Sequence, residues 1–273
     1  MSNPESSPGL VPSNPSLRSV HEAMHKAAAT ARRRAVRTSA AIAASERTQA
    51  LLADVDEQDP AFDALLGPAL QEAERALIYI AGNFAHFTIP GLGDSKRIQL
   101  AAGCLHLVLE HGQSIVVLTQ DKCFGSALAL QRPLHETFWR GLWLRYAATD
   151  SQVDDAGRDK FPVKGAILDG LDNTFKRDGS SYMAGSFWKH LCSYTHGGFQ
   201  QIGARLTADG LKSNYKLLEV MQVLRSAGMI QLATAAEFAS MAGDEALART
   251  VLEQLNAYVA PVEPPAARAE THE

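Results

Sequence analysis

Apolar residues recur at helical spacing along almost the whole sequence, and no run of alternating Val, Ile, Thr and aromatic residues is long enough for a good strand. Even the stretch closest to a strand, residues 115–120 (IVVLTQ), lies inside a longer helical pattern. The chain has 273 residues, and 43 of them are Ala, which loses no side-chain entropy in a helix. The sequence therefore predicts an all-α fold, a multi-helix bundle.

Proline and glycine divide the chain into four parts. Residues 1–16 hold four prolines among mostly polar residues, and residues 260–273 have a similar composition, so both ends are predicted to be disordered. Residues 17–54 contain neither Gly nor Pro, which predicts one long, Ala-rich and basic helix. The rest, residues 55–259, is expected to form the helical bundle domain.

Capping residues and helix breakers set the expected helix ends within the bundle. Asp94 or Ser95 is expected to cap the helix that follows it, and Pro133 to bend its helix or to mark its first turn. One or two short helices are expected within 150–180. The longer helices are predicted over 61–86, 96–121, 125–149, 181–196, 212–242 and 244–258.

Composition bears on compartment and partners. The net charge of −4 gives no global attraction to nucleic acid or to anionic membranes. The three cysteines lie far apart without a CxxC pair, which predicts reduced thiols in the cytosol rather than a disulfide framework. We see no basic-then-apolar leader, and charged residues break the apolar stretches below the roughly 18 residues of a membrane span. A cytoplasmic protein that does not bind membranes is expected.

Charge is uneven near the start of the chain. Residues 17–50 carry seven Lys and Arg against two acids, whereas residues 51–74 carry seven acids and no base. The basic segment either contacts phosphates, in a salt-sensitive way, or is a solvated face that pairs with the acidic stretch. Its small side chains would also let a partner helix approach closely, so we expect a homodimer through this helix or through a face of the bundle.

The string from His21 to His25, HEAMH, matches the HExxH pattern of zinc metalloproteases. In that pattern the two histidines bind zinc, and the glutamate polarises the bound water. A catalytic zinc needs a third ligand, and the acid nearest to a suitable spacing, Glu46, would lie about 31 Å from His25 along an unbroken helix. We therefore expect no metal and no cofactor, and keep a zinc metalloprotease as a remote alternative.

Arg132, Glu136 and Arg140 recur every four residues, so they stack on one face of a helix. Trp139 and Trp143 lie beside that face. Two interpretations stay open. The ladder is a half-buried set of ion pairs that holds the helix in register, or it is a clamp for an anionic substrate in which Glu136 orients the two guanidinium groups.

Lys189, Ser193 and His196 are spaced to share one face of a later helix. His196 stands at the end of that helix beside two glycines, where a ligand can approach closely. A histidine at a helix C-terminus tends to hold its proton, which favours a role as general acid. The alternative is that His196 only caps the last carbonyls of its helix.

The strings RPLHE (132–136) and CSYTHGG (192–198) resemble those of a family of uncharacterised bacterial helical proteins, which is similar in turn to the HEPN superfamily (higher eukaryotes and prokaryotes nucleotide-binding). The resemblance covers about 96–200. It implies a helical bundle that cleaves RNA without metal, usually as a dimer, often in toxin or phage-defence systems. HEPN ribonucleases carry an Arg, four to six residues, then a His; here Lys189 and His196 fit that spacing, with Lys in the place of Arg and without its bidentate fork.

These observations lead to two hypotheses about function. The first is a HEPN-like cytosolic defence or toxin protein that engages RNA or nucleotide phosphate and cleaves RNA without metal. The second is a non-enzymatic interaction or scaffold protein whose ladder is structural. In the first, His196 and Lys189 are catalytic, and the substrate-binding residues are Arg132, Glu136, Arg140 and Ser193.

Overall fold

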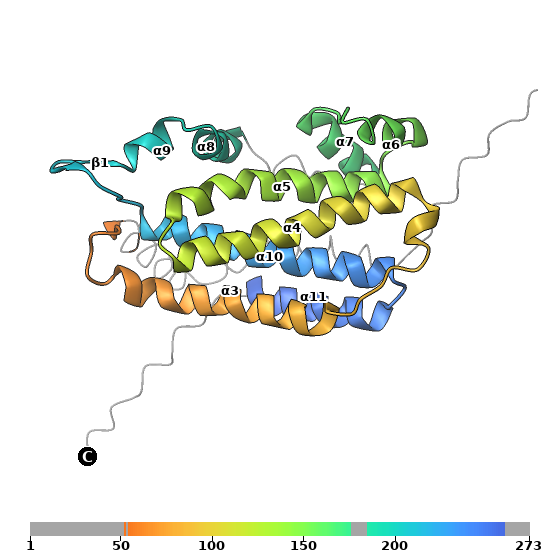
Figure 1. Ribbon diagram of the computed structural model, residues 1–273, viewed down its shortest axis with the longest axis horizontal. Coiled ribbons are helices and arrows are strands. Elements are labelled where there is room, and N and C mark those ends of the chain that lie inside the picture. Colours follow the sequence, from red (N-terminus) through yellow and green to blue (C-terminus); the bar gives the residue numbers. More distant parts are fainter. Residues whose placement is uncertain (1–51, 53, 176–184, 260–273) are drawn as a thin grey trace, which may run out of the picture.

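A computed structural model of the protein describes residues 52, 54–175 and 185–259 (Figure 1). The described chain is mostly helical, so the prediction of an all-α, multi-helix fold is confirmed. The long helices are α3 (Phe62–Phe84), α4 (Lys96–Gln120), α5 (Phe124–Tyr146), α10 (Leu217–Met241) and α11 (Glu245–Val259). The shorter elements are η1 (Leu92–Asp94), α6 (Asp150–Ala156), α7 (Lys164–Phe175), α8 (Gly185–Thr195), α9 (Phe199–Gly203), β1 (Leu206–Thr207) and β2 (Gly210–Leu211).

The long helices run side by side along the longest dimension of the molecule, with α10 at the centre (Figure 1). Helix α10 packs against α3, α4, α5 and α11, and residues 230–240 are all buried. A helix that is covered on every side needs an apolar or small residue at nearly every position, and α10 is rich in Ala, Leu and Met. Helices α7 and α8 pack on the outer surface of α5, α7 toward one end and α8 toward the other, while α6 contacts α4 and α9 contacts α8 (Figure 1).

Most predicted helix ends agree with the structure to within a few residues. Ser95 caps α4 as expected, since its hydroxyl accepts a hydrogen bond from the Ile98 amide at 3.4 Å. Helices α6 and α7 fill the stretch in which one or two short helices were expected. Pro133 does not mark a first turn, because α5 begins nine residues before it and continues beyond it.

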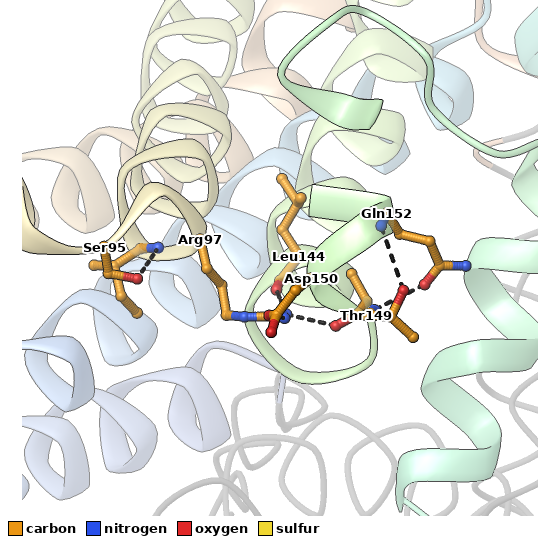
Figure 2. Close-up of polar contacts among 8 residues, drawn as sticks. Ser95, Arg97, Leu144, Thr149, Asp150 and Gln152 are labelled. Atoms are coloured by element: carbon orange, nitrogen blue, oxygen red, sulfur yellow. Dashed lines mark hydrogen bonds and ion pairs between the residues drawn. The ribbon is translucent and has the colours of Figure 1, made fainter. Parts of the chain in front are cut away.

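The corner between α5 and α6 is held by Arg97, from the first turn of α4 (Figure 2). Its guanidinium donates to the carbonyls of Leu144 and Ala148 at 2.7 and 2.6 Å, and pairs with Asp150 at 2.7 Å. Carbonyls at a helix C-terminus have no partner in their own helix, so a cation there satisfies them and suits the helix dipole. Thr149 then starts α6 with a capping box.

Two small features were missed from the sequence, α9 and the β1–β2 hairpin. Leu206 pairs with Leu211 and Thr207 with Gly210 in an antiparallel register. Strands of two residues are too short to show the alternation that marks a strand in a sequence. Together with α9 they form an arm, residues 199–211, that projects from one end of the bundle (Figure 1).

The predicted disordered ends, the HEAMH motif and nearly all of the predicted helix 17–54 lie outside the described residues. One described helix, α4, is long and apolar enough to cross a membrane by length and composition alone. That measure does not distinguish a membrane span from a core helix of a soluble protein, and α4 packs here against α5 and α10.

Candidate functional site

Helix α8 lies on α5, and the contact is built around a proline. Pro133 has no N–H, so it cannot donate to the carbonyl of Ala129, four residues earlier in α5. The hydroxyl of Thr195, the last residue of α8, lies 3.0 Å from that carbonyl and 3.0 Å from the Leu191 carbonyl of its own helix, so the two carbonyls share its proton. The proline therefore leaves an acceptor on α5 for α8, and this bond places the end of α8 beside the next turn of α5, which carries Arg132.

Arg132 is the centre of the candidate site. Its Nε donates to Glu136 Oε1 at 2.9 Å, one turn along α5. Its NH1 contacts Nε2 of His196, just beyond the end of α8. The guanidinium also lies 5.3 Å from the ring centre of Trp188 on α8. Arg132 and Glu136 are partly exposed and His196 is exposed, so solvent reaches the residues at this contact.

The contact with Arg132 bears on the role of His196. A guanidinium has donors only, so Nε2 of the imidazole is the acceptor in this contact. The sequence favoured a histidine that holds its proton as a general acid, and that role stays a prediction for His196. In the described chain its ring contacts the neighbouring helix and not the last carbonyls of α8.

Ser193 forms hydrogen bonds with the turn that follows α8. Gly197 has φ +63°, a conformation that favours glycine, and it ends the helix as predicted. The Ser193 carbonyl then accepts from Gly198 N at 2.7 Å, and its hydroxyl accepts from Gln200 N at 3.0 Å in the first turn of α9. The Ser193 hydroxyl thus satisfies an amide at a helix start but keeps its own proton to donate, so the prediction that it binds substrate stays a prediction.

Of the two ion pairs that the Arg–Glu–Arg ladder predicts, the described chain forms the one between Arg132 and Glu136. In the described part of the chain Glu136 pairs with Arg132 and not with Arg140. The guanidinium of Arg140 lies over Phe161, from the α6–α7 connection, at 4.6 Å from the ring centre. An aromatic face competes well for a guanidinium, since the weakly hydrated cation is attracted by the ring quadrupole. Glu136 therefore orients one guanidinium and not two.

Lys164 and Trp188 also belong to this surface, and both were missed from the sequence. Lys164, at the start of α7, places its ammonium 4.3 Å from the ring centre of Trp188, which also faces Arg132. Lys189 is exposed on α8. The surface where α5, α7 and α8 meet therefore carries cations set on aromatic rings. The pairing of Lys164 with Trp188 joins two helices, and no spacing within either segment indicates it.

His135, in the middle of the RPLHE string, belongs to the core. Its Nε2 lies 3.0 Å from the Ser226 hydroxyl on α10, and the side chain is 1% exposed. Burial lowers the pKa of His135 to about 4 from an ordinary value of 6.5. The ring is therefore neutral at physiological pH and packs at the α5–α10 contact, away from solvent.

A second polar cluster joins the end of α5 to α10 and is also buried. Glu237 accepts from Arg145 at 2.5 Å and from the Tyr146 hydroxyl at 2.6 Å, and Arg145 also donates to the Ser240 hydroxyl at 3.0 Å. Burial raises the pKa of Glu237, while Arg145 and the Tyr146 hydroxyl favour its charged form. We assign this cluster to the register of two core helices, because the side chains of Arg145 and Glu237 are only 9% and 2% exposed.

No metal site is apparent in the described ranges. Among residues 52, 54–175 and 185–259, no group of three or more His, Cys, Asp or Glu side chains is arranged to hold a metal ion. His21 and His25 lie outside these ranges, so the remote alternative of a zinc metalloprotease stays a hypothesis.

Comparison with known proteins gives one match. Residues 105–263, more than half of the chain, match a family of unknown function, DUF6988. No curated protein and no solved structure matches the chain. Nothing in these comparisons links it to the HEPN superfamily, so that resemblance stays a prediction. The matched range includes all of α5, α8 and α10, and with them the candidate site; the chain belongs to the family of unknown function DUF6988.

Proposed function

We propose that the α5–α8 site binds the phosphodiester backbone of RNA and cleaves it without a metal ion. The observation that carries this proposal is the contact between the guanidinium of Arg132 and the imidazole of His196, which lie 64 residues apart in the chain. A cation that binds phosphate and a base at one solvent-reachable point are the two groups that metal-free RNA cleavage needs.

Arg132 keeps donors free for a phosphate. A guanidinium has five N–H groups, and the contacts to Glu136 and His196 use one on Nε and one on NH1. The remaining donors can bind a phosphate oxygen while Glu136 holds the guanidinium in place. Arg140, two turns further along α5 and so about 12 Å away, and Lys164 on α7 would contact neighbouring phosphates of the same strand.

In the proposed reaction His196 acts as the base. Its Nε2 has one lone pair, which faces Arg132 in the free protein. When a phosphate binds, NH1 of Arg132 turns to the phosphate, and the lone pair of Nε2 is released to take the proton of the ribose 2′-hydroxyl. The 2′-oxygen then attacks the adjacent phosphorus. The bond from phosphorus to the 5′-oxygen breaks, which leaves a 2′,3′-cyclic phosphate and a 5′-hydroxyl. The leaving oxygen takes a proton from water, and the imidazolium returns its proton to solvent. Arg132 and the ammonium of Lys189 offset the charge that develops on the phosphate.

The proposal extends to the setting of the protein. RNA is the partner, and a nucleotide phosphate is the smallest unit that the same contacts would hold. A cytosolic defence or toxin role and a homodimer belong to the same proposal. The three cysteines, Cys104, Cys123 and Cys192, are all free, which suits a reducing compartment.

The test is cleavage of labelled single-stranded RNA in EDTA. Wild type is expected to cleave it, and His196→Ala to slow cleavage by about 100-fold or more, the usual contribution of a positioned base. His86→Ala is the matched control, since His86 is an exposed histidine just after α3. Equal cleavage by wild type and His196→Ala, or none by either, eliminates the catalytic proposal.

A non-enzymatic interaction protein is the second candidate. It is favoured by the ion pair between Arg132 and Glu136, because such a pair one helical turn apart also stabilises a helix without any ligand. In that case Arg132→Ala would lower the free energy of unfolding by about 0.5 kcal/mol and leave RNA binding unchanged. A loss of RNA binding in Arg132→Ala would contradict this second candidate.

A further inference from the structure

The arm, residues 199–211, exposes an unusual number of large apolar side chains. Four of the ten exposed large hydrophobic residues in the described chain lie in it, with Phe199 at 79% and Leu211 at 85% exposure. Ile202 is one turn from Phe199 on the same face of α9, and Leu206 is the cross-strand partner of Leu211. Exposed apolar residues gathered on one element mark an interaction surface.

The other side of the arm is fixed to the bundle. Gln201 donates to the carbonyl of Gly125 at 2.9 Å, and the Tyr215 hydroxyl donates to Gln201 at 3.0 Å. The Asn214 amide donates to Ala204 at 2.9 Å. Hydrogen bonds therefore hold the arm in place against the bundle, and its apolar side chains are left exposed to solvent.

The described chain begins at the base of this arm. Val55 accepts from the Leu217 amide at 3.0 Å, and Asp56 forms a bridge and an ion pair with Lys216. The Ser213 hydroxyl donates to Glu57 at 2.6 Å. Residues 55–57 are therefore bonded to residues 213–217, which follow the arm. The 51 residues before Leu52 are thus attached to the bundle near the arm at every protein concentration.

We infer that the apolar surface of the arm is the docking site for the N-terminal segment of the same chain, residues 17–51. This segment carries apolar residues at helical spacing, among them Val20, Met24 and Ile42, which need a surface to cover. A tether of this length places the segment at a high effective concentration beside the arm. Its cationic side chains are thereby held against the bundle beside the acidic stretch 54–63.

A second copy of the chain is a weaker occupant. Strands β1 and β2 have two residues each, and edges this short do not direct strand pairing between molecules. A copy in trans would also compete with a segment that is already attached at the base of the arm. The intramolecular contact therefore forms first.

The test is limited trypsin digestion of the full-length protein, with the cut sites read by mass spectrometry. Arg32, Arg33, Arg34 and Arg37 are cleavable positions within the segment. We expect cleavage there to be at least about ten-fold faster in Phe199→Ser/Leu211→Ser than in wild type, because proteolysis follows the population of the undocked segment. The matched control is Ile78→Ser, which removes an apolar side chain of 71% exposure from α3 and should leave the rate unchanged.

Equal cleavage rates in wild type and the arm variant overturn the inference. Protection that rises with protein concentration also overturns it, because a second copy is then the occupant. A photo-reactive residue at position 211 gives an independent measurement on an otherwise unaltered chain. It should crosslink within one chain to peptides from 17–51, and the absence of such crosslinks contradicts the inference.

Discussion

Acidification is expected to destabilise this protein through one buried side chain, His135. Its pKa is about 4 in the folded state and 6.5 ordinarily, and burial is the cause. Between these values the unfolded chain binds a proton at His135 that the folded chain does not. The contribution of His135 to the free energy of unfolding is therefore complete above pH 6.5 and is lost as the pH falls toward 4. A difference of about 2.5 at 1.36 kcal/mol per pH unit comes to about 3 kcal/mol, of which about 2.5 is lost between pH 7 and pH 4.5.

The assay is urea unfolding at several pH values for wild type and His135→Gln. Glutamine does not titrate and keeps an amide that can reach Ser226, so the difference between the two proteins isolates the histidine. The contribution of Glu237, whose raised pKa acts in the opposite direction with pH, is present in both proteins and cancels. The advantage of wild type should shrink by about 2.5 kcal/mol from pH 7 to pH 4.5. A difference that does not change with pH would refute the argument from burial.

Two further predictions concern packing. Gly228→Ala should lower the free energy of unfolding by about 1 to 3 kcal/mol, because a methyl group there overlaps the phenol of Tyr258. Gly103 has open space around it, so Gly103→Ala should raise the free energy of unfolding by about 0.5 to 1 kcal/mol in the same urea titration. Thr195→Val should cost about 1 kcal/mol by leaving the Ala129 carbonyl without its donor. It should also slow RNA cleavage, and Thr195→Ser should restore both; a cleavage rate that does not respond to either change contradicts the placing of α8 by this bond.

Helices were predictable because their ends carry local signals. Ser95 caps α4, and Gly197 ends α8 with a positive φ, and each signal can be read within a few residues of sequence. The arm was not predictable in the same way, because its strands pair over two residues and its position depends on Gln201 and Tyr215. Contacts of that kind exist only once the helices have packed.

The candidate site was predictable in part. Helical spacing placed Arg132 and Glu136 on one face, and their ion pair is present. Spacing also allowed a pair between Glu136 and Arg140, but Phe161 from another segment takes that guanidinium. A proline within a helix leaves the carbonyl four residues earlier without its helical donor. Pro133 therefore indicated an acceptor at Ala129 that a donor from another segment can bind, and in the structure that donor is the Thr195 hydroxyl.

The most direct measurement of the central claim uses an RNA oligonucleotide that carries a single 2′-deoxy sugar. If His196 takes the 2′-proton beside Arg132, the protein should cut the strand in EDTA at every susceptible linkage except that one and leave 2′,3′-cyclic phosphate ends. Cutting at the deoxy position, or products without cyclic phosphate, would contradict the account.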